Sequence, residues 1–326
     1  MKHVSILLLE QVNLAGLDNA RQGLLEANQF LLQKGMDPLF EVEVVGVQSS
    51  VTVNKGLFSI NSQKQISHLV ETDLIIIPPV QSPLEDALGK NMAFIPWIRS
   101  QRQKGAEIVS LCMGAFILAR TGLLDDRDCV THWKAGDAFK SLFPKVNLVS
   151  EKILTDHDGL YTGGGAFSSV NLILYLIEKM IGRECAVYCS KIFQVDLGRQ
   201  TQSPFIIFKG QRNHSDELVI QVQQYIESNY AGKLSIEAIC EVFNLNRRTF
   251  ERRFKKATAN SPIEYVQRVR MEAAKKLLEE GFKTVSEIVF EVGYTDMKAF
   301  RDVFKKVTGT TPLDYKSKFS TPLPVV

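Results

Sequence analysis

Hydrophobic positions in the first 181 residues follow two periods in turn. Short apolar or alternating runs, typical of strands, lie at 4–9, 41–47, 74–77 and 106–111, with a hairpin expected at 51–60. They alternate with segments whose apolar residues recur every three to four positions, typical of helices, at 18–33, 92–103, 113–120 and 167–181. Apolar strands that alternate with helices predict a parallel sheet covered on both faces. We therefore expect a doubly wound, flavodoxin-like α/β domain here.

The hydrophobic pattern changes after residue 195. Residues 196–214 mix glycine, proline and polar residues, which predicts a linker. The rest of the chain has helical periodicity, with helices expected at 218–229, 236–244, 247–257, 262–280, 285–292 and 297–307. The sequence therefore predicts three parts: an α/β domain over residues 1–195, a linker over 196–214 and an all-α domain over 215–318.

The helical region contains an internal repeat. With an offset of 50, residues 246–265 align on residues 296–315 and are identical at 7 of 20 positions. The shared residues include two phenylalanines spaced four apart, Phe250 and Phe254 in the first copy, which predict a buried stripe on one helix face. Two copies of one small helical unit are expected, since a solenoid needs three or more repeats.

Each copy has the parts of a helix-turn-helix motif. Residues suited to capping a helix precede both predicted helices of each copy: Ser235, Asn246, Thr284 and Asp296. A short helix, a turn and a second capped helix then follow in order. We expect helix-turn-helix motifs at 235–257 and 284–307.

Composition places the chain among globular proteins. Hydrophobic residues make up 45% and charged residues 23%, enough apolar material for the cores of two domains. The five cysteines form no C-x-x-C pair, so we expect no zinc site and no disulfide framework. We also expect no cofactor. No apolar run approaches the length of about 20 residues that a membrane span requires, so the sequence predicts a cytoplasmic protein without a membrane partner.

Charge divides unevenly along the chain. Residues 1–210 hold 20 Lys and Arg against 21 Asp and Glu, whereas residues 211–326 hold 19 against 15. Within the second part, residues 245–276 carry ten basic and three acidic residues. A solvated helix face would explain the excess alone, but two capped basic helices in a repeat favour binding to double-stranded DNA.

The segment GYTDMKAFRDVFKKVTGTTPLDY resembles the C-terminal signature of AraC/XylS-type transcription regulators, and residues 215–318 span that family's DNA-binding domain. The resemblance implies DNA contacts from the second helix of each motif, and RNA polymerase as a further partner. The implied residues are Arg247, Arg248, Glu251, Arg252 and Lys255 in the first motif, and Met297, Lys298, Arg301 and Lys305 in the second. Asp302 departs from the family, which commonly has arginine there, so we expect the first motif to dominate affinity.

In the first domain, Cys112 ends a predicted strand directly before a helix. Such an elbow exposes a side chain above the sheet, and a helix N-terminus lowers the pKa of a thiol. His132 in Thr-His-Trp is a candidate base, and three glycines at 163–165 open another helix. This order resembles the class I glutamine amidotransferase-like, or PfpI-like, domain, which a known group of AraC-type regulators carries.

Active members of that superfamily carry an acid on the first helix, and neither Asp18, Asn19 nor Arg21 matches it clearly. We therefore expect no enzyme activity and treat Cys112 and His132 as vestigial catalytic residues. The pocket is expected to bind a small metabolite instead. The expected lining residues are Cys112, Met113, His132, Trp133, Gly163 and Gly164.

The sequence thus predicts a transcription regulator that responds to a small molecule and forms a homodimer through its first domain. Two alternatives stay open. One is a PfpI-like thiol enzyme, a hydratase or amidase, fused to a DNA-binding module. The other is a redox sensor that uses Cys112.

Overall fold

A computed structural model of the chain contains two compact units, residues 1–202 and 203–326. It describes every residue except 166, 200, 213 and 321–326, so residues 200 and 213 of the predicted linker lie outside the described residues. Among the described residues, no helix has the length and apolar character needed to cross a membrane.

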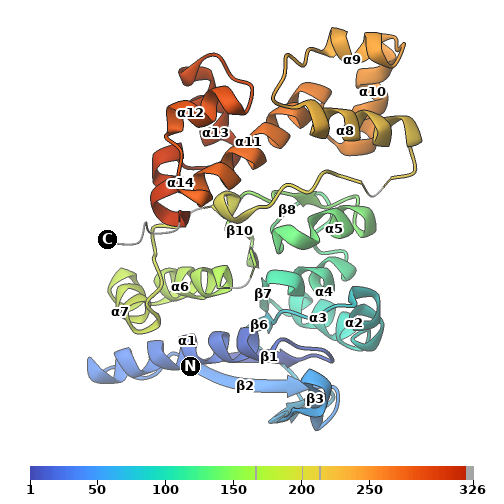
Figure 1. The fold of residues 1–326 in the computed structure, drawn as a ribbon. Helices are drawn as coiled ribbons and strands as arrows, with labels where there is room; N and C mark the ends of the chain where they lie inside the picture. The colour runs from blue at the N-terminus through green and yellow to red at the C-terminus, as the bar shows by residue number, and fades with distance from the viewer. Residues whose placement is uncertain (166, 200, 213, 321–326) are drawn as a thin grey trace. The chain divides into compact units, whose positions relative to one another are not determined.

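The first unit is built on one seven-stranded sheet in the order β10-β11-β7-β6-β1-β2-β5 (Figure 1). Its strands are β1 (Lys2–Leu8), β2 (Phe40–Gly46), β5 (Lys64–Gln65), β6 (Leu74–Ile77), β7 (Glu107–Leu111), β10 (Leu154–His157) and β11 (Leu160–Gly163). Neighbouring strands pair in parallel except β10 with β11. Because β1 lies between β2 and β6, the chain winds outward in both directions, which confirms the predicted doubly wound fold.

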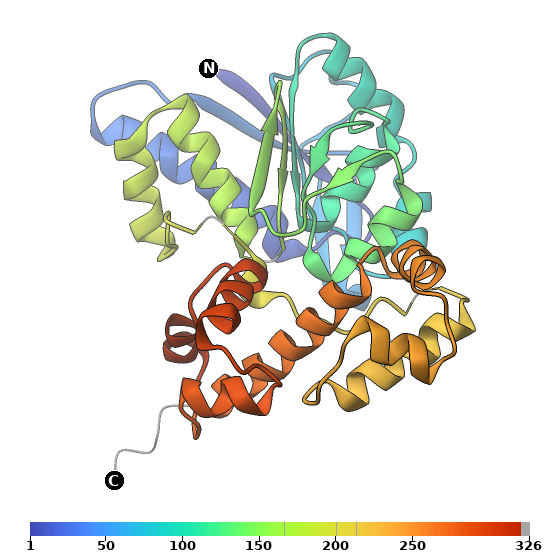
Figure 2. The same cartoon turned by 90° about the horizontal axis from the view of Figure 1, so that it is seen from above.

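Helices cover both faces of this sheet (Figure 2). One face carries α1 (Leu14–Gln33), α6 (Ser168–Met180) and α7 (Arg183–Phe193), which pack on one another, and the other carries α3 (Phe94–Gln103) and α4 (Ala115–Arg120). Smaller elements complete the unit: β3 (Ser50–Val53), β4 (Phe58–Asn61), α2 (Leu84–Lys90), β8 (Asp128–Cys129), α5 (Gly136–Leu142) and β9 (Asn147–Leu148). The predicted hairpin at 51–60 is confirmed, since β3 pairs antiparallel with β4.

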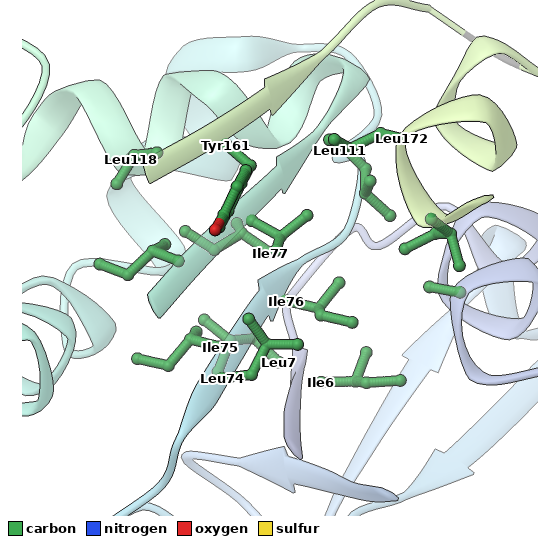
Figure 3. Packing of buried hydrophobic residues seen from close by; sticks show 14 of the residues in the cluster. Ile6, Leu7, Leu74, Ile75, Ile76, Ile77, Leu111, Leu118, Tyr161 and Leu172 are labelled. Atoms are coloured by element: carbon green, nitrogen blue, oxygen red, sulfur yellow. The ribbon is translucent and has the colours of Figure 1, made fainter. Parts of the chain in front are cut away.

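Aliphatic side chains of the central strands form the core (Figure 3). Ile6 of β1, Ile76 of β6 and Leu111 of β7 are completely buried, and Leu172 of α6 packs with them. Burying each such side chain contributes roughly 1.5–3 kcal/mol to the free energy of unfolding, so these strands form the well-packed centre of the unit. Their carboxyl ends therefore stand at fixed positions.

The described part of the second unit contains α-helices and no strand, as the sequence predicted, besides the short 3-10 turn η4 (Ser203–Phe205). They are α8 (Glu217–Asn229), α9 (Ile236–Val242), α10 (Arg247–Thr258), α11 (Pro262–Glu280), α12 (Val285–Glu291), α13 (Met297–Thr308) and α14 (Pro312–Phe319). The four predicted caps each accept a hydrogen bond from a main-chain N–H of the first helical turn: Ser235, Asn246, Thr284 and Asp296.

Two separate hydrophobic cores underlie the repeat. Phe250 and Phe254 of α10 lie in one core, and Phe300 and Phe304 of α13 lie in the other. The long helix α11 contributes side chains to both cores. The predicted stripe of paired phenylalanines is therefore buried in both copies, and the opposite faces of α10 and α13 are left to solvent.

Residues 203–212, which we call the arm, belong to the second unit although the sequence predicted a linker over 196–214. Phe208 packs its ring on buried Tyr265, with ring centroids 5.2 Å apart. The main-chain oxygen of Gln211 accepts a hydrogen bond from Gln223 Nε2 at 3.0 Å. On the other side of the division, Gln202 is buried within the first unit.

Candidate functional site

The chain turns sharply at Cys112, directly after β7. This residue has φ +53°, in the left-handed region, and begins the short turn η2 (Cys112–Gly114) that leads into α4. Gly114 allows the turn, because a Cβ there would lie 2.4 Å from the main-chain oxygen of Ile77. The predicted elbow is therefore present, with Cys112 at the carboxyl end of a central strand.

A cavity of about 360 Å³ opens beside the elbow. It lies beyond the carboxyl ends of β1, β6 and β7, the position where open α/β sheets bind ligands. Its described lining consists of Asn13, Ala15, Gly16, Asn19, Pro79, Val80, Gln81, Cys112, Met113, His132 and Phe167. The volume lies within the range typical of pockets for small molecules, which is about 300–1,000 Å³.

His132 is half-buried at one wall of this pocket. Its Nδ1 accepts a hydrogen bond from the main-chain N–H of Lys134 at 3.1 Å. Burial, followed by the charge of Lys134, holds the pKa of His132 below its usual value. The imidazole is therefore neutral at pH 7, and the bond at Nδ1 assigns its proton to Nε2.

The three carboxamide side chains of the pocket differ in whether they already form hydrogen bonds with the protein. Asn13 accepts a hydrogen bond from Gly16 N at 2.9 Å and so caps α1. Gln81 Nε2 donates to Asn54 Oδ1 at 3.1 Å. The side chain of Asn19 makes no hydrogen bond to any described residue, which leaves its donor and acceptor available to a ligand.

Three of the predicted lining residues meet at the cavity, namely Cys112, Met113 and His132. The described lining does not include the other three, Trp133, Gly163 and Gly164. The Trp133 ring lies beside His132, with centroids 5.6 Å apart, while Gly163 ends β11 and Gly164 faces the Gln202 carboxamide.

Sequence reasoning missed eight of the eleven described lining residues, and two of these, Asn19 and Phe167, bear on what the pocket can bind. On α1 it is Asn19 that lines the cavity, whereas Asp18 is exposed and lies 3.8 Å from Arg21. The first helix thus presents an amide to the cavity, and the described lining includes no acid from this helix. Phe167 follows the glycine loop and is 75% exposed at the cavity.

The side chain of Gln202 links the end of the first unit to the loops that contain Thr131 and Ser150. Its Nε2 donates to the main-chain oxygens of Thr131 at 3.1 Å and Ser150 at 2.8 Å. The hydroxyl of Thr131 in turn donates to the main-chain oxygen of Cys112 at 2.9 Å. The end of the first unit is therefore tied to the strand-end loops that carry Cys112 and His132.

The second candidate site is the solvent face of α10. Arg248, Arg252 and Lys255 are exposed there, and no carboxylate of the described residues pairs with Arg248 or Arg252. Arg247 is different, because its guanidinium binds the carboxylates of both Glu237 and, at 3.1 Å, Glu251. The predicted set is thus present on one helix, with Arg247 and Glu251 already engaged with each other.

Arg253 of the same helix has a structural role. Its guanidinium donates to Asp216 through Nε at 2.6 Å and Nη2 at 2.9 Å, and Asp216 also caps α8 by accepting from Val219 N. This pair fixes α10 against the start of α8.

On α13 the exposed predicted residues are Lys298, Arg301 and Lys305. Met297 is half-buried and packs partly on the second core. Asp302 is exposed on the same helix. The solvent face of α13 is therefore less uniformly basic than that of α10.

Comparison with family models gives two matches. The helix-turn-helix domain model matches residues 239–318, and the model of the DJ-1/PfpI family matches residues 33–179. The chain joins a DJ-1/PfpI domain to an AraC-type helix-turn-helix domain. The predicted family resemblance is thereby confirmed.

Curated relatives share this pairing or parts of it. The HTH-type transcriptional regulator CdhR of Pseudomonas aeruginosa is 25% identical over 289 residues, covering 88% of this chain and 83% of CdhR. GbdR of the same species, another HTH-type transcriptional regulator, is 25% identical over 61% of this chain but over only 54% of its own length. Isonitrile hydratase of Pseudomonas putida is 30% identical over 112 residues, 34% of this chain and 46% of the hydratase.

Solved structures support the fold of the DJ-1/PfpI unit. An AraC family transcriptional regulator from Pseudomonas putida has a TM-score of 0.51 and 20% identity, covering 59% of this chain and all of that chain. DJ-1β of Drosophila melanogaster has a TM-score of 0.50 and 18% identity, covering 60% of this chain and 98% of that chain.

Proposed function

We propose that the protein is a transcription regulator that binds DNA through α10 and α13 and responds to a small molecule held at the Cys112 elbow. The observation that carries the DNA-binding part is the repeat itself: two capped helices bury paired phenylalanines and turn basic faces to solvent. The names of CdhR and GbdR as transcriptional regulators support the same assignment.

In this proposal each helix enters a major groove, where arginine can bind guanine O6 and N7 in a bidentate way. Because α11 contributes to both cores, it holds the two motifs in a fixed relation, and they contact successive grooves about 34 Å apart. The contacts come from Arg248, Arg252 and Lys255, with Arg247 and Glu251 acting as a pair, and from Met297, Lys298, Arg301 and Lys305. Asp302 repels phosphate, so the first motif supplies more of the affinity.

The elbow pocket would bind its ligand without converting it. The described lining carries no carboxylate that could serve as the acid of a thiol enzyme. In the same proposal residues 1–195 sense the ligand, residues 215–318 bind DNA, the protein dimerises through the first unit, and RNA polymerase is a further partner.

The test begins with selection of a binding site from a random duplex pool by the full-length protein, followed by footprinting. Protection of two major grooves one helical turn apart is expected, and protection of a single groove would contradict the tandem arrangement. A metabolite screen by thermal shift then compares the wild type with Ala15→Phe, which fills the pocket mouth. A ligand at 100 times its Kd raises stability by about 2.7 kcal/mol. Ligands that stabilise both proteins equally would refute the pocket assignment.

A thiol enzyme is the second candidate, favoured by the strained Cys112 elbow and by the similarity to isonitrile hydratase. Turnover of small isonitriles, nitriles or amides by the wild type, abolished in Cys112→Ser, would establish it. A redox sensor would instead show DNA binding that depends on peroxide and on Cys112.

A further inference from the structure

We infer that the elbow pocket selects an uncharged ligand with a carboxamide-like polar head and an apolar body. This inference rests on the proposed function, because it names the class of molecule that the proposed site takes. It is carried by the side chains that line the cavity.

The first observation is the absence of Asp, Glu, Lys and Arg from the described lining. Its polar side chains are three carboxamides, a thiol and an imidazole that is neutral at pH 7. Moving an ionised carboxylate or ammonium group out of water without a partner of opposite charge is costly. A charged head group would therefore lose hydration in this cavity and gain no ion pair.

The second observation concerns the two polar groups that remain available. The side-chain amide of Asn19 offers one acceptor oxygen and two N–H donors, and none of these three groups bonds to a described residue. His132 offers the Nε2–H, since its Nδ1 is occupied by Lys134 N. A primary amide matches these groups, because its carbonyl accepts from His132 or Asn19 and its NH₂ donates to the Asn19 oxygen.

The third observation is the apolar part of the wall. Val80 and Met113 line the cavity, and the exposed ring of Phe167 stands at it. A hydrocarbon or aromatic ligand body would cover these surfaces and remove the Phe167 ring from water. The three observations together define an uncharged amphipathic molecule.

The experiment uses the full chain and four probes of nearly equal size: 2-phenylacetamide, phenylacetate, phenethylamine and phenylalanine. They are neutral, anionic, cationic and zwitterionic at pH 7.5. Calorimetry or thermal shift should give 2-phenylacetamide a Kd at least about tenfold lower than any of the charged probes, because only the neutral head avoids the desolvation cost of a charge.

Two variants at one position test the contact. Asn19→Asp should reverse the preference, so that phenethylamine binds at least about tenfold more tightly than to the wild type, since the new carboxylate supplies the missing partner. Asn19→Leu should weaken 2-phenylacetamide without favouring any charged probe. Asp18→Asn changes the adjacent exposed residue, which does not line the cavity, and should leave all four affinities unchanged.

The outcomes separate this inference from the proposed function. Tighter binding of a charged probe by the wild type, lost in Ala15→Phe, would overturn the ligand class while supporting a ligand site at the elbow. Binding of 2-phenylacetamide that persists in Ala15→Phe would place it elsewhere and overturn the inference. Failure of all four probes to bind would also overturn it, while the metabolite screen still decides the proposed function.

Discussion

The ammonium of Lys275 donates a hydrogen bond to the main-chain oxygen of Ile206 at 2.5 Å, although 69 positions separate the two residues. The Lys275 side chain is only 5% exposed and also binds Glu272 at 2.9 Å. The same Glu272 oxygen accepts from Phe208 N at 3.1 Å. One buried ion pair on α11 therefore binds two main-chain groups of the arm.

Lys275→Met should destabilise the second unit by about 3–5 kcal/mol, because it leaves the Glu272 carboxylate without its partner in a largely dry site. Chemical denaturation followed by circular dichroism measures the change. Lys276→Met is the matched control, since Lys276 is the exposed neighbour on the same helix. Equal stability of the two variants would show that the pair does not hold the arm.

Arg248→Ala and Arg252→Ala should each weaken binding to the selected DNA site by about 1–3 kcal/mol if the arginine reads a base. Arg253→Ala removes the same charge from the same helix but breaks the pair with Asp216. Its main effect should therefore be a lower melting temperature. The preference for the selected duplex over the scrambled one should change little. Fluorescence anisotropy against selected and scrambled duplexes distinguishes these effects. Unchanged affinity in both Arg248→Ala and Arg252→Ala would refute the proposed contacts.

Acid should destabilise the first unit partly through His132. Its pKa is lower in the folded protein than the unfolded value of about 6.5, so the unfolded chain binds the proton more tightly. The resulting stability is present above pH 6.5, falls as the pH drops below it, and levels off beneath the folded-state pKa. Urea denaturation between pH 7.5 and 5 should show a steeper loss for the wild type than for His132→Asn. If the free energy of unfolding fell equally with pH in both proteins, His132 would not be a source of the acid sensitivity.

Cys112→Ser tests the thiol. If Cys112 only lines the pocket, the variant should keep its response to the ligand, because serine retains the size and some polarity of cysteine. A nucleophile would instead lose all turnover, and a redox switch would lose only its response to oxidant. A reporter assay with ligand, and separately with peroxide, separates the three. Loss of the ligand response in a folded variant would contradict the pocket-lining role.

Local sequence signals predicted six of the seven numbered α-helices described in the second unit and missed α14. Caps such as Ser235 and Thr284 act within one helical turn, so their effect is visible in the sequence without knowledge of tertiary structure. Short helices were harder. The N-cap residues of α2, α5 and α7 are Pro83, Ala135 and Gly182, and none of the three makes a side-chain cap bond, so a local signal for the start of these helices is missing.

The pocket could be predicted from the sequence only in part. The elbow at Cys112 follows from a strand that runs directly into a helix, and it was predicted. Whether Asp18 or Asn19 faces the cavity depends on the rotation of α1, which the burial of Leu17 and Ala20 against the sheet decides. The pairing of Arg247 with Glu237 likewise depends on the packing of α9 against α10 and could not be read from spacing.

The arm also determines where this chain can be divided. A fragment that starts at residue 215, where helical periodicity resumes, lacks the Phe208 ring that covers Tyr265 and the Ile206 carbonyl that Lys275 binds. A fragment over 203–320 keeps both. Recombination that exchanges one sensory domain for another, in the laboratory or during evolution, would therefore preserve the helical unit best with a breakpoint between Gln202 and Ser203.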